Sequence, residues 1–257
     1  MHSDPENHSG RSVAFLGLAI AGFSVLCWFF PIDIWVSAHF YDAKTDTWPL
    51  GDQVPWWHIY HTVSVLSLSW TIGLLLWMAL TSAAGQRKLR RRIGLVLCAW
   101  VLVPGVLINA VLKAHSGHSR PAELAVFGGQ HEYSPPWQWH RPNAGQSFPS
   151  GHAAAGFFPL VLAFVSGWRY RLWWVVFGIC SGGVVGAARV VAGGHFLSDV
   201  LWSGYLVWAG AWILAKVFQS KTLPTLQQDP PLPRSAYLWG GCLWLVATLI
   251  GVRLLWP

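Results

Sequence analysis

The chain has 257 residues, of which 54% are hydrophobic and only 11% are charged, whereas roughly a quarter of the residues in a soluble domain carry charge. This composition leaves too little polar surface for a water-soluble protein, so it predicts a polytopic membrane protein. The formal net charge of +7 comes mostly from basic residues in the loops on one side of the predicted spans. This is the pattern that sets membrane orientation, and it argues against a nucleic-acid-binding surface.

Seven apolar segments approach the roughly 20 residues that a helix needs to cross the hydrocarbon core of a bilayer. In chain order they are residues 12–30, 59–80, 93–112, 153–168, 172–188, 196–218 and 237–256. The sequence therefore predicts an all-α bundle of transmembrane helices, with six core spans and a seventh, C-terminal span. We expect residues 1–257 to form a single integral membrane domain.

Between the first two spans, residues 31–57 are rich in aromatic side chains. Ile32, Trp35, Val36, His39 and Phe40 follow helical spacing, which is consistent with a short helix lying in the outer membrane interface. An ordered loop anchored by its aromatic rings would have the same composition. The sequence leaves both interpretations open.

Basic residues gather in the loops on one side of the predicted spans. Five of them lie between the second and third spans, and the alternation of spans puts others on the same side: Arg87, Lys88, Arg90, Arg91 and Arg92, with Arg11, Arg169, Arg171, Lys216, Lys221 and Arg234. Because cytoplasmic loops carry an excess of Lys and Arg, this side is predicted to be cytoplasmic. The proline-rich segment 219–236 is then a cytoplasmic linker, and the long polar loop 113–152 is external.

Polar and charged residues recur at the external ends of four spans. Lys113 closes the third, Ser150-Gly151-His152 opens the fourth, Arg189 closes the fifth, and His195 opens the sixth. Ionisable side chains near membrane depth are costly to keep, so they are taken as candidates for a functional site. Arginine and lysine side chains bind phosphate oxygens, and helix N-termini offer free backbone N–H groups to anions. The pattern predicts a phosphate-binding site.

Within this group, His195 and Asp199 are four residues apart and share one face of a helix. The aspartate can accept one ring N–H, which leaves the other ring nitrogen free to attack an electrophile. His152 is a candidate general acid. Taken singly, each residue also has a structural interpretation: Lys113 and Arg189 as interfacial cations, Ser150 as a helix cap, Asp199 as an ion-pair partner. Their recurrence at one depth favours a shared site.

The spacing of these residues resembles the three-part motif of the type 2 phosphatidic acid phosphatase superfamily. In the first part, six residues separate Lys113 from Arg120-Pro121. The second part is Pro149-Ser150-Gly151-His152. In the third part, five residues separate Arg189 from His195, and three more separate His195 from Asp199. The resemblance implies that His195 is a nucleophile oriented by Asp199 and that His152 protonates the leaving group. It implies that the phosphate is held by Lys113, Arg120, Arg189 and the Ser150-Gly151 backbone. One position departs from the family, which often has Ser where Ala188 stands.

The resemblance predicts an integral membrane phosphatase that acts on a lipid phosphate or pyrophosphate through a phosphohistidine, without a metal or other cofactor. Its expected setting is a bacterial inner membrane, with the site on the periplasmic side and membrane lipids as neighbours. Phosphatidylglycerol phosphate, undecaprenyl pyrophosphate, phosphatidate and a lipid A phosphate all remain possible substrates, and the oligomeric state is open.

Other functions fit the sequence less well. A phosphotransferase would use the same intermediate and pass the phosphate to a lipid hydroxyl. A lipid transporter is disfavoured because the charges cluster at one face of the membrane. The pairs His58 with His61 and His115 with His118 have helical spacing that could serve a metal, but the cationic surroundings favour hydrogen bonding or head-group contact instead.

Overall fold

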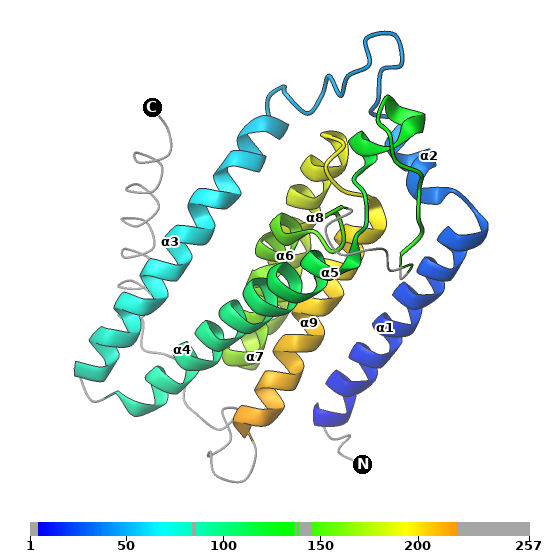
Figure 1. Cartoon of the computed structure of the whole chain (residues 1–257). Helices are drawn as coiled ribbons and strands as arrows, with labels where there is room; N and C mark the ends of the chain where they lie inside the picture. Colours follow the sequence, from blue (N-terminus) through cyan, green and yellow to red (C-terminus); the bar gives the residue numbers. More distant parts are fainter. Residues whose placement is uncertain (1–4, 84–85, 137, 139–144, 220–257) are drawn as a thin grey trace.

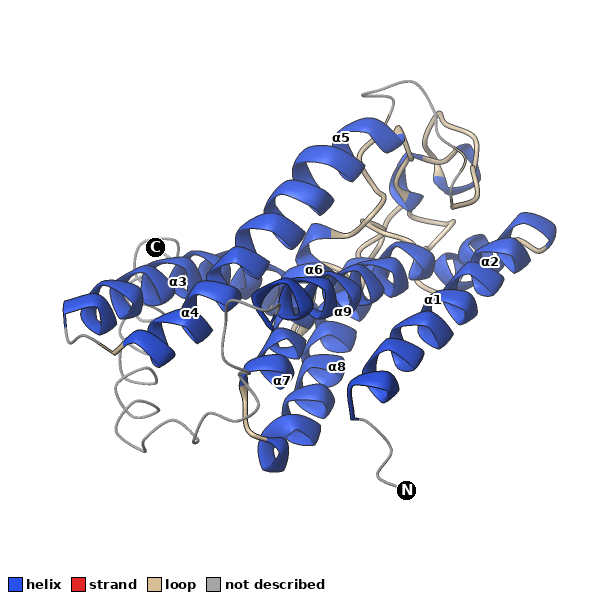
Figure 2. Ribbon diagram, turned by 90° about the horizontal axis from the view of Figure 1, so that it is seen from below, coloured by secondary structure: helices blue, strands red, loops and turns tan. Residues whose placement is uncertain are grey.

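A computed structural model describes residues 5–83, 86–136, 138 and 145–219 of the chain (Figure 1). In these ranges most residues are helical, the rest form loops and turns, and no strand forms (Figure 2), so the predicted all-α class is confirmed. The predicted C-terminal span at 237–256 lies outside the described residues, and so does all of the linker 219–236 except Gln219.

Within the described residues, five helices are long and apolar enough to cross a membrane, and a shorter apolar helix covers Gly151–Val165. They correspond to the six predicted core spans. The long elements are α1 (Pro5–Phe29), α3 (Trp56–Ala83), the continuous rod formed by α4 (Arg87–Trp100), η1 (Val101–Leu112) and α5 (Lys113–Ser116), α8 (Trp168–Val191) and α9 (Leu197–Gln219).

The third span begins earlier than predicted because its basic residues are already helical at Arg87. Its middle section, η1, is wound as a wide π-helix that contains Pro104. Proline lacks a backbone N–H and crowds the preceding turn, and local widening is one way in which a helix continues past such a disruption. The side-chain amide of Asn109 donates to the Pro104 carbonyl at 2.7 Å. The rod ends where Gly117 adopts a left-handed conformation, with φ of 63°.

The fourth span is built from three short helical pieces: α6 (Gly151–Phe157), η4 (Phe158–Val161) and α7 (Leu162–Val165). Pro159 lies at the first break and contributes no backbone donor. This span packs closely against α8, because a Cβ atom on Gly182 would come within 2.1 Å of the Phe157 ring. Small residues at helix contacts let transmembrane helices approach in this way.

The segment after the first span forms a short helix, α2 (Ile32–Ala38), so the helical interpretation of this region is confirmed. Its placement in the membrane interface remains a prediction. Trp35 is 65% exposed, whereas Asp33 is fully buried against the bundle. An acidic side chain buried in a short helix needs partners, and these lie at the start of α9.

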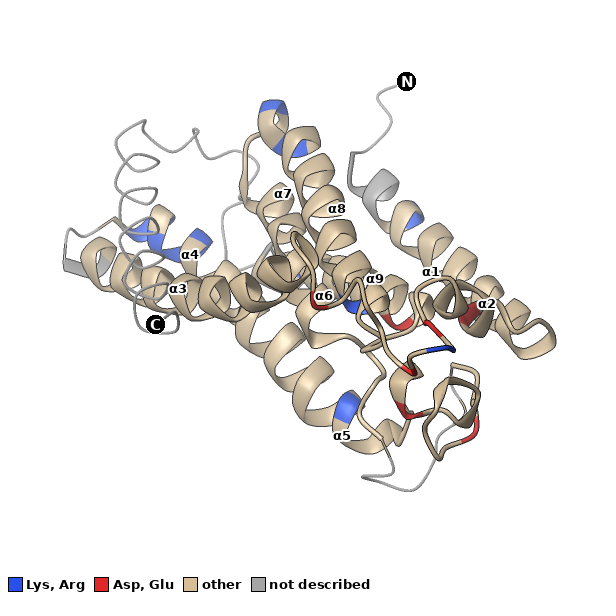
Figure 3. Cartoon of the chain, turned by 90° about the horizontal axis from the view of Figure 1, so that it is seen from above, with Lys and Arg blue, Asp and Glu red and all other residues tan. Residues whose placement is uncertain are grey.

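Charge is distributed unevenly along the bundle. Figure 3 shows Lys and Arg at the beginnings of α4 and α8, while most of the Asp and Glu gather around the loops beside α2 and α5. This asymmetry agrees with the predicted gathering of basic residues on one side of the spans.

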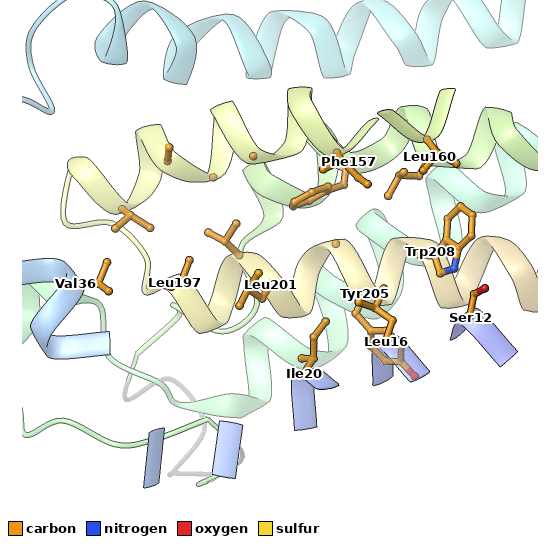
Figure 4. A pocket seen from close by; sticks show the side chains of 18 of the residues that line it. Ser12, Leu16, Ile20, Val36, Phe157, Leu160, Leu197, Leu201, Tyr205 and Trp208 are labelled. Carbon is orange, nitrogen blue, oxygen red and sulfur yellow. The ribbon is translucent and has the colours of Figure 1, made fainter. Parts of the chain in front are cut away.

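A cavity of about 890 Å³ lies between α1, α6, α8 and α9 (Figure 4). Its lining is largely apolar, with Ser12, Arg171 and Tyr205 among the exceptions, and it includes none of the predicted catalytic or phosphate-binding side chains. The cavity is therefore separate from the cluster described below.

Candidate active site

The loop that joins α5 to α6 is closed at its base by two hydrogen bonds. The Ser147 N–H donates to the His118 carbonyl at 2.8 Å, and the Ser116 hydroxyl donates to the Phe148 carbonyl at 3.0 Å. A third bond, from the Ala122 N–H to the Gly193 carbonyl at 3.0 Å, ties the loop to the turn between α8 and α9. These bonds bring the three parts of the sequence motif together.

The turn between α8 and α9 positions His195. Gly193 has a φ of 64°, which favours glycine, and a Cβ atom there would come within 2.4 Å of the Trp48 ring. The N–H groups of Gly194 and His195 both donate to the Arg189 carbonyl, at 2.9 and 3.3 Å. The turn therefore fixes His195 beside the end of the helix that carries Arg189.

His195 and Asp199 form a buried pair. The Nδ1 atom of His195 lies 3.5 Å from Oδ2 of Asp199, and the two side chains are 1% and 0% exposed. The same oxygen accepts hydrogen bonds from the Ser147 hydroxyl at 2.6 Å and from the Phe196 N–H at 2.9 Å. The predicted pair is thus present, and Ser147 is an additional contact that the sequence analysis did not identify.

Burial lowers the pKa of His195, while Asp199 opposes this shift. Because desolvation dominates, the imidazole is neutral near pH 7. With Nδ1–H directed toward Asp199, the lone pair lies on Nε2. This is the protonation state that a nucleophilic histidine requires.

Tyr60 of α3 lies between two predicted site residues. The guanidinium carbon of Arg189 sits 4.3 Å from the centroid of the Tyr60 ring, and the His152 ring centroid lies 4.9 Å from the same ring. A cation over an aromatic face is attracted by the ring quadrupole. Tyr60 therefore holds both Arg189 and His152, a role that its sequence position did not reveal.

The cations converge around His152. The charges of Arg189, Lys113 and Arg120 all act on its ring, as does that of His195. In the described part of the chain, the buried Nε atoms of Arg120 and Arg189 have no hydrogen-bond partner. Buried donors are normally paired, so these two nitrogens are available to an anion that carries several acceptor oxygens.

Ser150 and Gly151 have different roles from each other. Ser150 caps α6, since its hydroxyl accepts the Ala153 N–H at 3.3 Å, and its own N–H donates to the Asp199 carbonyl at 3.4 Å. A Cβ atom on Gly151 would approach the Asn109 amide oxygen to 2.4 Å, so a larger residue would displace Asn109. Ser150 is thus committed to protein contacts, and of this pair the Gly151 backbone remains the better candidate for a phosphate.

The histidine pair His115 and His118 does not share a helix face. His115 is exposed and hydrogen-bonds the Val111 carbonyl within its own helix, whereas His118 follows Gly117 and is only 2% exposed. His118 hydrogen-bonds the Ser134 carbonyl at 2.6 Å, as one of the two interpretations expected, but its burial is inconsistent with a head-group contact. It lies inside the site, next to Asp199.

The described part of the chain is thus an all-α bundle in which buried His and Asp side chains lie near several cations. The chain belongs to the PAP2 superfamily, whose family model matches residues 91–223. It is similar to a lipid A 4'-phosphatase of Francisella tularensis subsp. novicida, with 27% identity over 80% of this chain and 96% of the relative.

A lipid A 4'-phosphatase of Rhizobium etli is 35% identical over 46% of this chain and 45% of the relative. No solved structure matches the chain significantly. The protein is thus a bacterial membrane lipid phosphatase of the PAP2 superfamily.

Proposed function

We propose that the protein removes the 4'-phosphate of lipid A through a phosphohistidine on His195, at the periplasmic face of the inner membrane. The choice of lipid is supported by the Francisella relative, which is aligned over 96% of its length. The observation that carries the chemistry is the burial of His195 against Asp199, beside three cations of which two have unpartnered guanidinium nitrogens.

In the first step, Nε2 of His195 attacks the phosphorus and the bond from phosphorus to the lipid oxygen breaks. His152, in its protonated form, transfers a proton to that oxygen, so the lipid leaves as a neutral alcohol. The phosphorylated imidazole is cationic and keeps Nδ1–H directed at Asp199. The buried carboxylate stabilises the charge that develops on the ring.

In the second step, a water molecule attacks the phosphohistidine and gives its proton to the neutral His152. The bond from phosphorus to Nε2 breaks, and inorganic phosphate departs. His195 regains its lone pair and His152 regains its proton, so the cycle is closed without a further reactant.

Fixed cations supply the charge stabilisation in this proposal. Lys113, Arg120 and Arg189 neutralise the phosphate oxygens before and during the transfer, in a site where burial strengthens each interaction. The backbone N–H groups at the start of α6 can add hydrogen bonds to the same oxygens. We therefore propose that turnover is independent of a divalent metal.

The proposed sidedness follows from loop charge. The basic ends of α4 and α8 lie away from the acidic loops beside α2 and α5 (Figure 3), and basic loops stay in the cytoplasm. The motif loop then opens toward the periplasm.

A panel of lipids tests the substrate. The purified protein in detergent is given bisphosphorylated lipid A, the two monophosphorylated forms with phosphate at the 1 or the 4' position, phosphatidate, phosphatidylglycerol phosphate and undecaprenyl pyrophosphate. Mass spectrometry should show loss of the 4'-phosphate alone, and His195→Asn should release none. Faster hydrolysis of the 1-phosphate or of a glycerophospholipid would overturn the substrate proposal and leave the family assignment intact.

A further inference from the structure

His118 occupies the face of Asp199 that His195 does not use. Its Nδ1 atom lies 3.8 Å from Oδ1 of Asp199, and the side chains are 2% and 0% exposed. The ring is flanked by Phe148 and Phe196, with centroids 6.1 and 5.6 Å away in edge-on orientations. The contact between His118 and Asp199 is therefore shielded from solvent.

The second ring nitrogen fixes the protonation pattern of His118. Its Nε2 atom lies 2.6 Å from the Ser134 carbonyl oxygen. A carbonyl oxygen can only accept a hydrogen bond, so Nε2 must carry a proton. In a neutral ring, Nδ1 would then hold a lone pair.

That lone pair would face a carboxylate. Oδ2 of Asp199 is occupied by Ser147, Phe196 and His195. Within the described residues, Oδ1 of Asp199 and Nδ1 of His118 are both buried without a hydrogen-bond partner, and they face one another. Two buried acceptors opposed in this way are unfavourable, whereas a proton on Nδ1 turns the 3.8 Å contact into a buried ion pair.

We propose that His118 is a positioning residue, protonated on both nitrogens, that holds the second oxygen of Asp199. Asp199 then lies between two imidazoles: one fixes the carboxylate, and the other receives the phosphate. Two carboxylates interact electrostatically with the His118 ring, Asp199 from α9 and Asp33 from α2. The inference rests on the proposed role of Asp199 and His195.

The role of His118 in the reaction follows from this geometry. With Oδ1 held, Oδ2 stays directed at the nucleophilic ring when that ring becomes positively charged. The positive charge on His118 also moderates the pull of Asp199 on the His195 proton. Loss of His118 should therefore lower kcat and raise the pKa of His195, with little change in KM, because His118 does not line the cluster of phosphate-binding cations.

Two substitutions separate this role from a purely structural one. In His118→Asn, the amide nitrogen can occupy the position of Nδ1 and donate to Asp199. In His118→Gln, the longer side chain places its amide near Nε2, where it can keep the bond to the Ser134 carbonyl. We expect kcat to fall about ten- to hundredfold in the glutamine variant, the range for leaving a buried charged group without its partner, and less in the asparagine variant.

The pH profile of kcat/KM gives an independent readout. Both variants remove the positive charge beside Asp199, so the acidic limb that reports protonation of His195 should move to higher pH. His115→Gln, at an exposed histidine three residues earlier, is the matched control and should keep the wild-type rate and profile. An unshifted limb, or a glutamine variant at least as active as the asparagine variant, would overturn the inference.

The wild-type protein allows a test that does not depend on variants folding. With ¹⁵N-labelled histidine, and with His118 assigned through the neighbouring Gly117 and Ser119 amides, both ring nitrogens should resonate as an imidazolium near neutral pH. A neutral-ring pattern would refute the inference. Activity in His195→Asn would instead refute the proposed function, whatever the His118 variants do, so the two failures are distinguishable.

Discussion

The buried carboxyl group of Asp33 should make the free energy of unfolding depend on pH. Asp33 accepts hydrogen bonds from the Ser198 N–H at 3.0 Å, from the Ser198 hydroxyl and from Tyr133 at 3.3 Å. Burial nevertheless raises the pKa of Asp33 from 3.8 to about 6. Between these two values the folded protein keeps a proton that the unfolded chain has lost, so stability falls as the pH rises through this window.

The size of this effect follows from the shift. One pKa unit corresponds to about 1.4 kcal/mol, so a rise of roughly two units removes about 3 kcal/mol of stability between about pH 4 and pH 7. The asparagine in Asp33→Asn cannot ionise, so this variant should not lose the roughly 3 kcal/mol of stability as the pH rises. The difference in the free energy of unfolding between variant and wild type should therefore move by about 3 kcal/mol in favour of the variant across that range.

Reversible chemical unfolding in mixed micelles, followed by tryptophan fluorescence at several pH values, measures this difference. Asp52→Asn removes an exposed carboxyl group from the same segment, and its pH profile should stay that of the wild type. A difference between Asp33→Asn and wild type that is constant with pH would refute the reasoning.

Four further outcomes are expected. Activity should survive EDTA, and a loss that Mg²⁺ or Zn²⁺ restores would contradict the metal-free mechanism. His152→Asn should lose far more activity on a lipid phosphate than on an aryl phosphate, because a phenol leaving group needs less protonation. The loss on the lipid should lie within the roughly 10²–10⁴-fold that general acids supply, and equal losses on the two substrates would contradict a general-acid role for His152. Tyr60→Leu should weaken the hold on Arg189 by about 0.5–2 kcal/mol, measured as a higher KM, and an unchanged KM would argue against the stacking role. In a cysteine-free background, an impermeant thiol reagent should label His131→Cys but not Arg90→Cys in intact cells, and the reverse pattern would overturn the topology.

The membrane architecture could be predicted from hydrophobic length because a helix must satisfy its backbone hydrogen bonds within itself when no water is present. This rule located the core spans, although the fourth one is built from short pieces around Pro159. Local packing and proline chemistry decide such breaks, and hydropathy alone does not report them.

The pair His195 and Asp199 could be predicted because its members are only four residues apart. The expected shared helix face is not present, since His195 lies in the turn before α9, which begins at Leu197. The contacts that complete the cluster join distant parts of the chain, so no periodicity indicates them. Ser147 is 52 residues from Asp199, and Asp33 is 165 residues from Ser198. The available signal for Asp33 was its acidic character within a short, otherwise mostly apolar helix, since a buried carboxyl group requires donors.

Trapping of the phosphoenzyme tests the central claim most directly. The protein is mixed with ³²P-labelled lipid A, quenched within the first turnover and digested under basic conditions, in which phosphohistidine is stable. A base-stable, acid-labile phosphate is expected on the peptide that contains His195, and no label is expected in His195→Asn. Absence of label on that peptide during steady turnover, or equal labelling of the variant, would contradict the claim.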